Sequence, residues 1–258
     1  MNKTLKTIVR ACLPRSVKQQ RILAGPLRGC SLVTSWHDYP GAITGRTERP
    51  LLDWFAANVK QGDTWLDIGA HYGYTAIALS RLVGLQGRVF AFEPMLSTAG
   101  YLAQTRSLNN LSQMTIVPLA LASIFDLSSK QLPVTRGMVD STLNGSNWLE
   151  TFLIARLDWL WPRICRGRPR IDGVKMDVQG MEVDVLRGMY DTLTEQHPKL
   201  VIEVHRGVDR VELLTLIENM GYSRTATPVE PTQGEVEPMY VDDRSYAFRV
   251  AKLNDLPI

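Results

Sequence analysis

The sequence predicts an α/β fold in which helices cover both faces of a doubly wound, mostly parallel sheet. From Asp63 onward, short apolar runs of strand length alternate with longer segments of helical periodicity. Parallel strands need crossover connections, and such helices provide them. The 258 residues are 45% hydrophobic, and this content is enough for one sizeable core. The sequence shows no internal repeat. We therefore expect a main domain over residues 50–258 behind an N-terminal extension over residues 1–49.

The N-terminal extension begins with a strongly basic segment. Residues 1–37 contain several lysines and arginines but no acid, and an apolar stripe at helical spacing runs beside the basic residues until Pro14. A basic amphipathic helix over Met1–Leu13 fits this pattern. It could attach the protein to a membrane surface or pack on its own domain, and the extension as a whole could also cap a substrate site.

The remaining elements follow from turn signals and periodicity. A glycine-proline turn at residues 25–29 precedes a strand over Cys30–Thr34 and a helix over Glu48–Val59. The βα units after Asp63 are then predicted as strand Thr64–Ile68, helix Thr75–Val83, strand Arg88–Phe92, helix Thr98–Leu108 and strand Thr115–Leu119.

The second half begins with a polar segment over Ser123–Trp148, which we interpret either as a mobile substrate loop or as an irregular surface excursion. A strand over Thr151–Arg156 follows, and Asp158 is expected to cap a short helix that ends before Pro162. The last predicted elements are strand Ile171–Asp177, helix Met181–Met189, strand Lys199–His205 and an antiparallel pair, Ser223–Thr227 with Ser245–Ala251.

The most informative local pattern is a strand, a glycine turn and a helix. Asp67 lies next to the end of the first strand of the alternating region, Gly69 and Gly73 bracket the turn, and Glu93 ends the next strand. Such a turn lets backbone N–H groups and a helix N-terminus approach a polar ligand, and an acid in the position of Glu93 can accept both hydroxyls of a ribose. The spacing departs from G-x-G-x-x-G, which weakens the prediction of an NAD site.

A second polar group is expected at the same edge of the sheet. Asp177 ends a central strand and is followed by Gln179 and Gly180, while Glu203 and His205 share side-chain parity on the next strand. An imidazole that titrates near neutral pH suits a general base, so His205 is a candidate beside Asp177. Asp177 and Glu203 could instead bind a divalent metal, but the sequence has no dense carboxylate cluster or C-x-x-C pair, and we expect no metal.

These residues carry a family resemblance. The segment Lys175-Met176-Asp177-Val178-Gln179-Gly180-Met181-Glu182, with Val185-Leu186-Arg187-Gly188 after it, looks like the Lys-x-Asp-x-x-Gly-x-Glu…Leu-x-Gly signature of FkbM-type methyltransferases. Asp67-Ile68-Gly69-Ala70-His71-Tyr72-Gly73, with Phe92-Glu93-Pro94, similarly resembles motif I and the ribose acid of S-adenosylmethionine-dependent methyltransferases. Two positions depart from the pattern: Gln179 replaces a frequent Glu, and His71 replaces a frequent Asn.

The resemblance implies a Rossmann-like, seven-stranded methyltransferase sheet with S-adenosyl-L-methionine as cofactor. It also implies O-methylation of a hydroxyl on a sugar, glycan or polyketide-like product. Asp177 and His205 would be catalytic. The cofactor would contact Asp67, Gly69, Ala70, His71, Gly73, Glu93, Pro94 and Asp177. Two alternatives stay open: an NAD-dependent oxidoreductase, and a non-catalytic cofactor-binding protein that the missing charge at Gln179 would allow.

Composition bounds the partners and the location. A net charge of +3, without a basic run interleaved with aromatics, favours a small-molecule or glycan hydroxyl acceptor over nucleic acid. The three cysteines are widely separated, which is typical of reduced thiols. We find neither an 18-residue apolar run nor a signal-peptide core, so we expect a cytoplasmic protein, with membrane contact limited to the N-terminal helix.

Overall fold

The structure is a computed structural model that describes residues 12–124, 128–135, 138–139, 149–165, 170–230 and 242–251. The predicted basic helix over Met1–Leu13 falls almost entirely outside these residues, as does the stretch 140–148 of the predicted polar loop.

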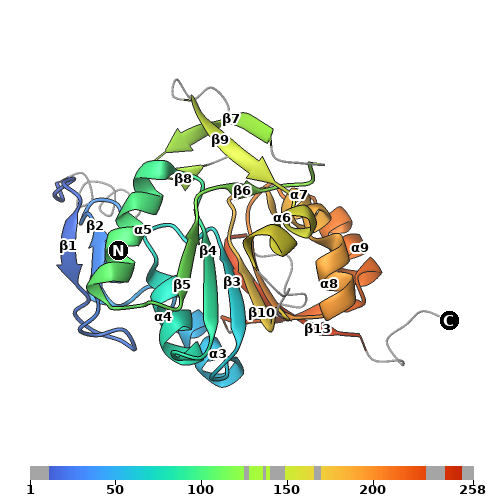
Figure 1. Cartoon of the computed structure of the whole chain (residues 1–258), viewed down its shortest axis with the longest axis horizontal. Helices are drawn as coiled ribbons and strands as arrows, with labels where there is room; N and C mark the ends of the chain where they lie inside the picture. The colour runs from blue at the N-terminus through green and yellow to red at the C-terminus, as the bar shows by residue number, and fades with distance from the viewer. Residues whose placement is uncertain are drawn as a thin grey trace.

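A seven-stranded sheet forms the centre of the molecule, in the order β12-β13-β11-β10-β3-β4-β5 (Figure 1). The strands β5, β4, β3, β10 and β11 are parallel to one another, and β13 runs antiparallel to both β11 and β12. The chain is therefore a Rossmann-like α/β protein, as predicted. The strands are β3 (Thr64–Ile68), β4 (Arg88–Phe92), β5 (Met114–Val117), β10 (Gly173–Met176), β11 (Lys199–Val204), β12 (Tyr222–Pro228) and β13 (Arg244–Val250).

Strand order reverses direction between β3 and β10. From β3 the chain proceeds to β4 and β5 on one side, then returns to place β10 and β11 on the other. In doubly wound sheets, ligands bind beyond the carboxyl ends of the strands at this point. The topology thus directs attention to the residues that follow β3, β4, β10 and β11.

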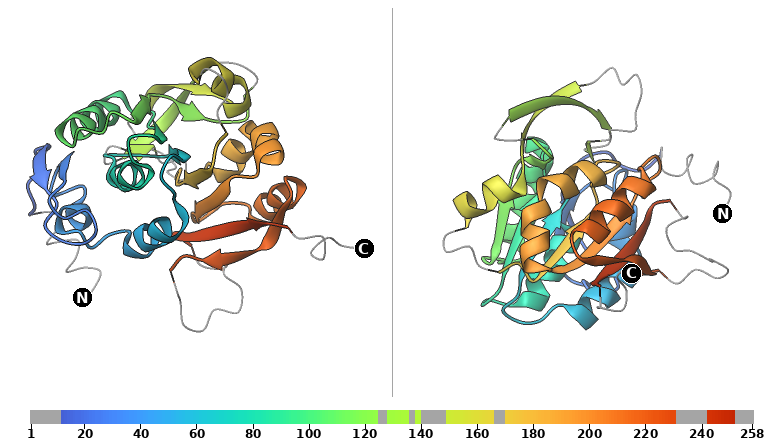
Figure 2. Two further views of the ribbon diagram at one scale, coloured as in Figure 1. Left: turned by 60° about the horizontal axis from the view of Figure 1, so that its bottom comes forward. Right: turned by 90° about the vertical axis from the view of Figure 1, so that its right-hand side faces the viewer.

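Helices cover the sheet on both faces (Figures 1 and 2). Each face has its own hydrophobic cluster. On one face α3 and α4 pack with the N-terminal extension, and on the other α6 to α9 pack over β10 and β11. The helices are α2 (Pro40–Thr44), α3 (Arg49–Asn58), α4 (Tyr74–Val83), α5 (Leu96–Leu108), α6 (Leu157–Ile164), α7 (Glu182–Gly188), α8 (Tyr190–Gln196) and α9 (Arg210–Asn219).

The N-terminal extension contains a hairpin, β1 (Lys18–Arg21) with β2 (Ser31–Thr34), that packs along α5. The backbone N–H of Val33 donates to Thr105 Oγ1 at 3.0 Å, and Asn109 bonds both the N–H and the carbonyl of Ser31. The short helix α2 follows. Neither β1 nor α2 was predicted, because four exposed polar residues and a five-residue helix carry little periodicity.

Two predictions for the segment between β5 and β10 are wrong. Helix α6 continues through Pro162 instead of ending before it, and its N-cap is Arg156 rather than Asp158. Proline inside a helix loses one hydrogen bond, but Leu157, Leu160 and Trp161 are buried here, and this packing outweighs the loss.

The predicted polar loop also has more structure than expected. Within it, β7 (Ser128–Thr135) pairs with β9 (Leu149–Ala155), in a small sheet completed by β6 (Ala120–Leu121) and β8 (Met138–Val139). This sheet lies above the carboxyl ends of the central strands (Figures 1 and 2). The polar composition and Pro133 concealed β7, since its pairing partner lies far along the chain.

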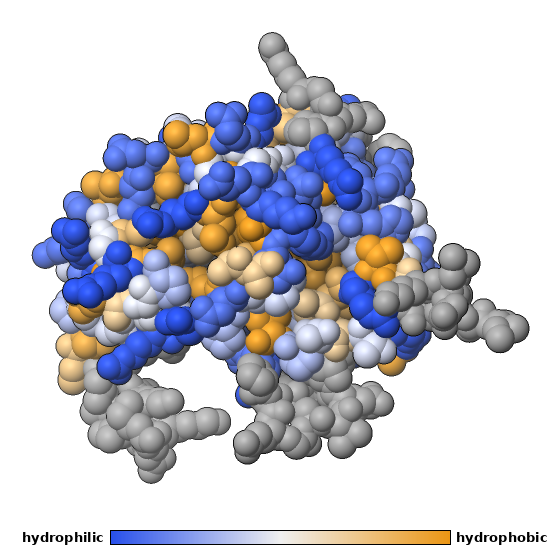
Figure 3. Space-filling view, turned by 90° about the horizontal axis from the view of Figure 1, so that it is seen from below, coloured by the Kyte–Doolittle hydropathy of each residue, from blue (hydrophilic) through white to orange (hydrophobic). Residues whose placement is uncertain are grey.

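The face seen from below mixes hydrophilic and hydrophobic residues and has no single apolar surface across it (Figure 3). Among the described residues, the large hydrophobic side chains that are exposed include Leu85, Leu96 and Val211. Within the same residues, no helix has the length and apolar character to cross a bilayer.

Candidate functional site

A cavity of about 440 Å³ opens at the carboxyl ends of β3, β4, β10 and β11. Its other walls come from the N-terminal extension, the segment after β5 and the start of α7. The lining includes Asp38, Tyr39, Glu48, Gly69, Ala70, His71, Tyr74, Glu93, Pro94, Leu119, Lys175, Asp177, Gln179, Met181 and Glu203. A volume of this size is typical of small-molecule and cofactor sites.

The glycine turn after β3 brings two strands close together. Gly69 has φ +81°, and a Cβ at this position would lie 1.8 Å from the Asp177 carbonyl oxygen. Gly73 has φ +94° at the N-cap of α4, where a Cβ would lie 2.3 Å from Leu102. Only glycine combines this backbone conformation with this approach.

Three backbone donors of the turn are already hydrogen-bonded within the protein. The N–H groups of Gly69 and Ala70 donate to the Phe92 carbonyl at 3.1 and 2.9 Å, and the N–H of His71 donates to Glu93 Oε2 at 2.9 Å. These bonds tie β3 to the end of β4. The turn therefore shapes the cavity and orients Glu93, and its glycines act sterically.

Glu93 lies at the cavity with a rigidly held carboxylate. Its second oxygen, Oε1, accepts from the N–H of Met95 at 3.0 Å, and the side chain is buried. Burial raises the pKa of Glu93 to about 7, against the effect of the two backbone donors. Each oxygen keeps a lone pair, so the carboxylate can accept further hydrogen bonds from a diol.

Lys175, which sequence analysis did not assign to the site, lies at its centre. It is buried in β10, directly opposite Asp67 of β3 in the parallel register. Its Nζ lies 3.1 Å from Asp67 Oδ1 and 3.6 Å from Asp177 Oδ2, and it donates to the Gly69 carbonyl. Burial favours the neutral amine, but the two carboxylates outweigh it and raise the pKa of Lys175. The sequence did contain a signal for this role, because Lys175 is the one charged residue in the otherwise apolar strand β10.

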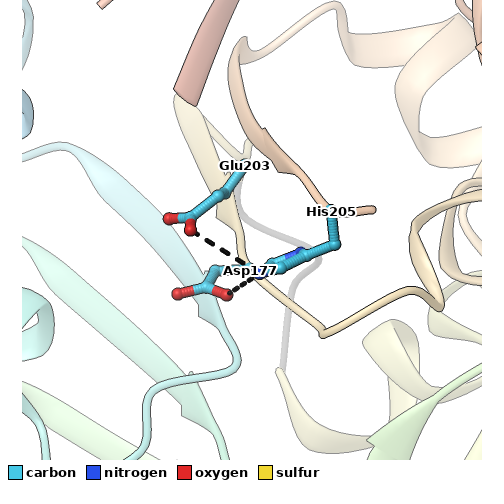
Figure 4. Close-up of side chains that lie close together, drawn as sticks. All are labelled: Asp177, Glu203 and His205. Carbon is cyan, nitrogen blue, oxygen red and sulfur yellow. Dashed lines mark ion pairs between the residues drawn. The ribbon is translucent and has the colours of Figure 1, made fainter. Parts of the chain in front are cut away.

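Asp177, Glu203 and His205 come together where β10 and β11 end (Figure 4). His205 Nε2 lies 3.4 Å from Asp177 Oδ1 and 3.6 Å from Glu203 Oε1. The predicted juxtaposition of these residues follows from the sheet register, because Asp177 and Glu203 each come one residue after the paired Met176 and Ile202.

His205 is held from behind by Glu182 in the first turn of α7. The two side chains are buried, and Nδ1 lies 2.5 Å from Glu182 Oε1. Burial favours the neutral ring, but the Glu182 contact and the charge of Asp177 raise the pKa of His205 to about 9. The ring is therefore cationic at neutral pH, which does not fit our expectation of a resting base. The cationic ring of His205 places a positive charge next to the carboxylates of Asp177, Glu182 and Glu203.

Glu203 is a carboxyl group whose surroundings favour its neutral, protonated form. The nearby charge of Asp177, together with burial, raises the pKa of Glu203 to about 8. Asp177, Glu203 and His205 each offer one ligand atom within 4.8 Å, so the carboxylates are more clustered than the sequence suggested. Lys175 and cationic His205 already supply positive charge there, which disfavours a metal ion.

An aromatic wall, defined as Tyr39, His71 and Tyr74, lines another side of the cavity. The ring centroid of Tyr39 lies 5.5 Å from that of His71 and 6.1 Å from that of Tyr74. Burial lowers the pKa of His71 to about 4, so its ring is neutral. Tyr39 and the nearby Glu48 belong to the N-terminal extension, where no motif indicated them.

The structure thus places Gly69, Ala70, His71, Glu93, Pro94 and Asp177 on the cavity lining. Asp67 and Gly73 lie behind it: Asp67 is fully buried, accepts a 2.7 Å hydrogen bond from Thr75 Oγ1 and pairs with Lys175. His205 contacts the cavity residues Asp177 and Glu203 from their far side.

The model of the protein family described as "Methyltransferase FkbM domain" matches residues 67–224 of the chain. The chain belongs to the FkbM methyltransferase family. It is therefore an S-adenosylmethionine-dependent methyltransferase, as the resemblance implied, and the NAD-dependent alternative falls away.

The chain is also similar, at low identity, to other proteins. The chain is 25% identical over 195 residues to the hexuronic acid methyltransferase AglP of Haloferax volcanii, covering 70% of this chain and 72% of that protein. Two solved structures are similar: a methyltransferase FkbM from Methylobacillus flagellatus (16% identity, 76% of this chain and 50% of that one, TM-score 0.49) and an rRNA methylase from Streptococcus thermophilus (12%, 81% and 99%, TM-score 0.48).

The cavity fits S-adenosylmethionine. Glu93, on the cavity lining, would hold the ribose hydroxyls, and the backbone of the turn at Gly69 and Ala70 would lie against the cofactor. Leu119, Met181 and Val185 offer an apolar surface for the adenine base. Carboxylates nearby favour the positive sulfonium.

Proposed function

We propose that this enzyme methylates a hydroxyl of a sugar, glycan or polyketide-like small molecule. The observation that carries the proposal is the position of Asp177, which lines the same cavity as Glu93 and lies 3.4 Å from the buried His205. A carboxylate with a cationic partner is suited to orient a hydroxyl. The archaeal relative, a hexuronic acid methyltransferase, supports a sugar-type acceptor.

S-adenosylmethionine supplies a methyl group on a sulfonium, so the protein has to orient the acceptor oxygen and remove its proton. Asp177 accepts the hydrogen bond of the acceptor hydroxyl and takes its proton. His205, fixed by Glu182, keeps the Asp177 carboxylate in place. Glu203, whose pKa is raised to about 8 by the charge of Asp177 and by burial, is a further hydrogen-bonding group beside them. Proton removal of this kind contributes about 10²–10⁴-fold, and positioning supplies the rest.

The N-terminal extension supports this function through residues 38–48, which we assign to the acceptor wall of the cavity. Attachment of Met1–Leu13 to a membrane stays a prediction from its basic, apolar pattern. Co-sedimentation with anionic vesicles, comparing the full chain with a truncation of these residues, measures it, and equal sedimentation of the two would favour a self-packed helix.

The test begins by screening extract fractions for acceptors of labelled methyl groups. With an acceptor in hand, Asp177→Asn and His205→Ala should bind S-adenosylhomocysteine nearly normally but lose at least about 100-fold in turnover. Asp191→Asn is the control, because that carboxylate is exposed and pairs with Arg156. Near-wild-type turnover in both variants would refute the assignment. We expect no metal requirement, and loss of activity on adding a chelator would assign the chemistry to a metal.

A further inference from the structure

Three carboxylates from three parts of the chain face the acceptor side of the cavity: Glu48 at the N-cap of α3, Asp177 after β10 and Glu203 on β11. They are close enough to influence one another. Burial and the charge of Asp177 raise the pKa of Glu48, and the charge of Asp177 is the main cause of the raised pKa of Glu203. The three acids therefore do not all ionise readily, because the negative charge of one carboxylate disfavours ionisation of the next.

The neighbouring cations are already paired. Lys175 is shared between Asp67 and Asp177, and His205 is bonded to the buried Glu182. The amino-acid end of the cofactor is a zwitterion and adds no net charge, so the cofactor would bring only the one positive charge of its sulfonium to these three acidic side chains. The described part of the cavity lining thus leaves room for a further cation.

The aromatic wall lines the same cavity as these carboxylates. Burial and, after it, the charges of Glu48, Asp177 and Glu203 raise the pKa of Tyr39. Two polar atoms on this wall, His71 Nε2 and Tyr74 Oη, are buried without a hydrogen-bond partner. Buried polar atoms normally have partners, so a ligand with hydroxyl groups is the natural one here. Aromatic faces combined with carboxylates are a common way to bind an ammonium group.

We propose that the acceptor is an amine-bearing polyhydroxyl compound, of the amino sugar class. Its ammonium group contacts Glu48 and Glu203, its ring packs on the aromatic wall, and Asp177 receives the hydroxyl that is methylated. The inference rests on the proposed function of this cavity. A hexuronic acid, the substrate in the name of the archaeal relative, carries a carboxylate that these three acids would repel.

The experiment uses the full chain saturated with S-adenosylhomocysteine and three probes that differ mainly in charge: methyl glucosaminide, methyl glucoside and methyl glucuronide. Calorimetric titration at pH 7 and low salt should give at least about tenfold tighter binding of the glucosaminide than of the glucuronide, with the glucoside between them. Glu48→Gln and Glu203→Gln should each weaken glucosaminide binding about tenfold and leave glucoside binding unchanged. Glu218→Gln, at the exposed pair with Arg224, is the matched control.

Each variant is first checked for unchanged affinity for S-adenosylhomocysteine, which shows that it is folded. Equal binding of the three probes, tighter binding of the glucuronide, undetectable binding of the glucosaminide, or a preference that survives both substitutions would overturn the inference. So would stoichiometric Mg²⁺ binding to chelator-treated protein that removes the amine preference. If the glucosaminide binds as expected but no hydroxyl receives a labelled methyl group, the proposed function fails and the amine site stands.

Discussion

At the scale of single residues, the site is built on charges buried in strands. Asp67 and Lys175 face each other across β3 and β10, and both are almost completely inaccessible. Burying a pair of charges requires good geometry and further hydrogen bonds, which Thr75 and the Gly69 carbonyl provide. This pair fixes the position of Asp177, because the Lys175 ammonium contacts both carboxylates.

We predict that Lys175→Met destabilises the protein by about 3–5 kcal/mol, because it leaves Asp67 charged and buried without its partner. Urea unfolding measures the change. The double variant Asp67→Asn with Lys175→Met should recover much of the loss. Lys199→Met is the control in the neighbouring strand, since that ammonium donates to the carbonyl of Asn58 instead of pairing with an acid. Equal losses in the two single variants would show that the buried pair has no special role.

We predict that Glu93→Ala weakens S-adenosylhomocysteine binding by about 10- to 100-fold, since hydrogen bonds to a charged group contribute about 1.5–3 kcal/mol. Calorimetric titration of the folded variant measures it. Glu218→Gln serves as the control. Unchanged affinity would remove Glu93 from the cofactor site.

At the scale of elements, the turn between β3 and α4 decides how closely β3 and β10 approach. Gly69 and Gly62 share a positive φ, +81° and +88°, but their surroundings differ. A Cβ on Gly69 would meet the Asp177 backbone, whereas nothing lies within 4 Å of a Cβ on Gly62. The two positions therefore separate backbone strain from steric exclusion.

We predict that Gly62→Ala costs about 1–2 kcal/mol of unfolding free energy, the usual cost of a left-handed conformation in a residue with a side chain. Gly69→Ala should cost at least about 1–3 kcal/mol more and should also weaken cofactor binding, because Asp177 has to move. Urea unfolding and calorimetric titration measure the two effects. Similar losses for both variants would mean that the close approach of β10 is not maintained in solution.

At the scale of the whole molecule, the titrating groups of the site should set the pH dependence of stability. The pKa values of Glu93, Glu203 and His205 are raised to about 7, 8 and 9 from ordinary values near 4.5, 4.5 and 6.5. Between pH 6.5 and about pH 9 these three groups therefore bind more protons in the folded protein than in the unfolded chain. Stability that these groups contribute at lower pH is lost as the pH rises through their folded pKa values.

We predict that the ligand-free protein loses stability steadily between pH 6.5 and pH 9, by up to about 1.4 kcal/mol per pH unit for each proton involved. Urea midpoints across this range measure the effect. Glu203→Gln should flatten the decline below pH 8, while Glu218→Gln should leave it unchanged. Stability that rises over this range would contradict the raised pKa values.

The sequence by itself determined the alternation of strands and helices, the glycine turn and the acids that end β4 and β10, because these are local patterns with a fixed period or position. β3 and β4 begin and end at the predicted residues. The family signature in Lys175–Glu182 is also contiguous. The proximity of Asp177, Glu203 and His205 could also be predicted from the sequence, since parallel strands end at one edge of the sheet.

Only the tertiary structure decided which groups carry charge and what the acceptor side contains. The contact of Glu182 with His205, the pairing of Lys175 with Asp67 and the approach of Tyr39 and Glu48 all join residues that are distant in the chain. The pKa of an imidazole depends on burial and neighbouring charges, which no local pattern reveals, so the cationic state of His205 could not be predicted. The strand β7 stayed hidden for the same reason, because its partner in the sheet is remote.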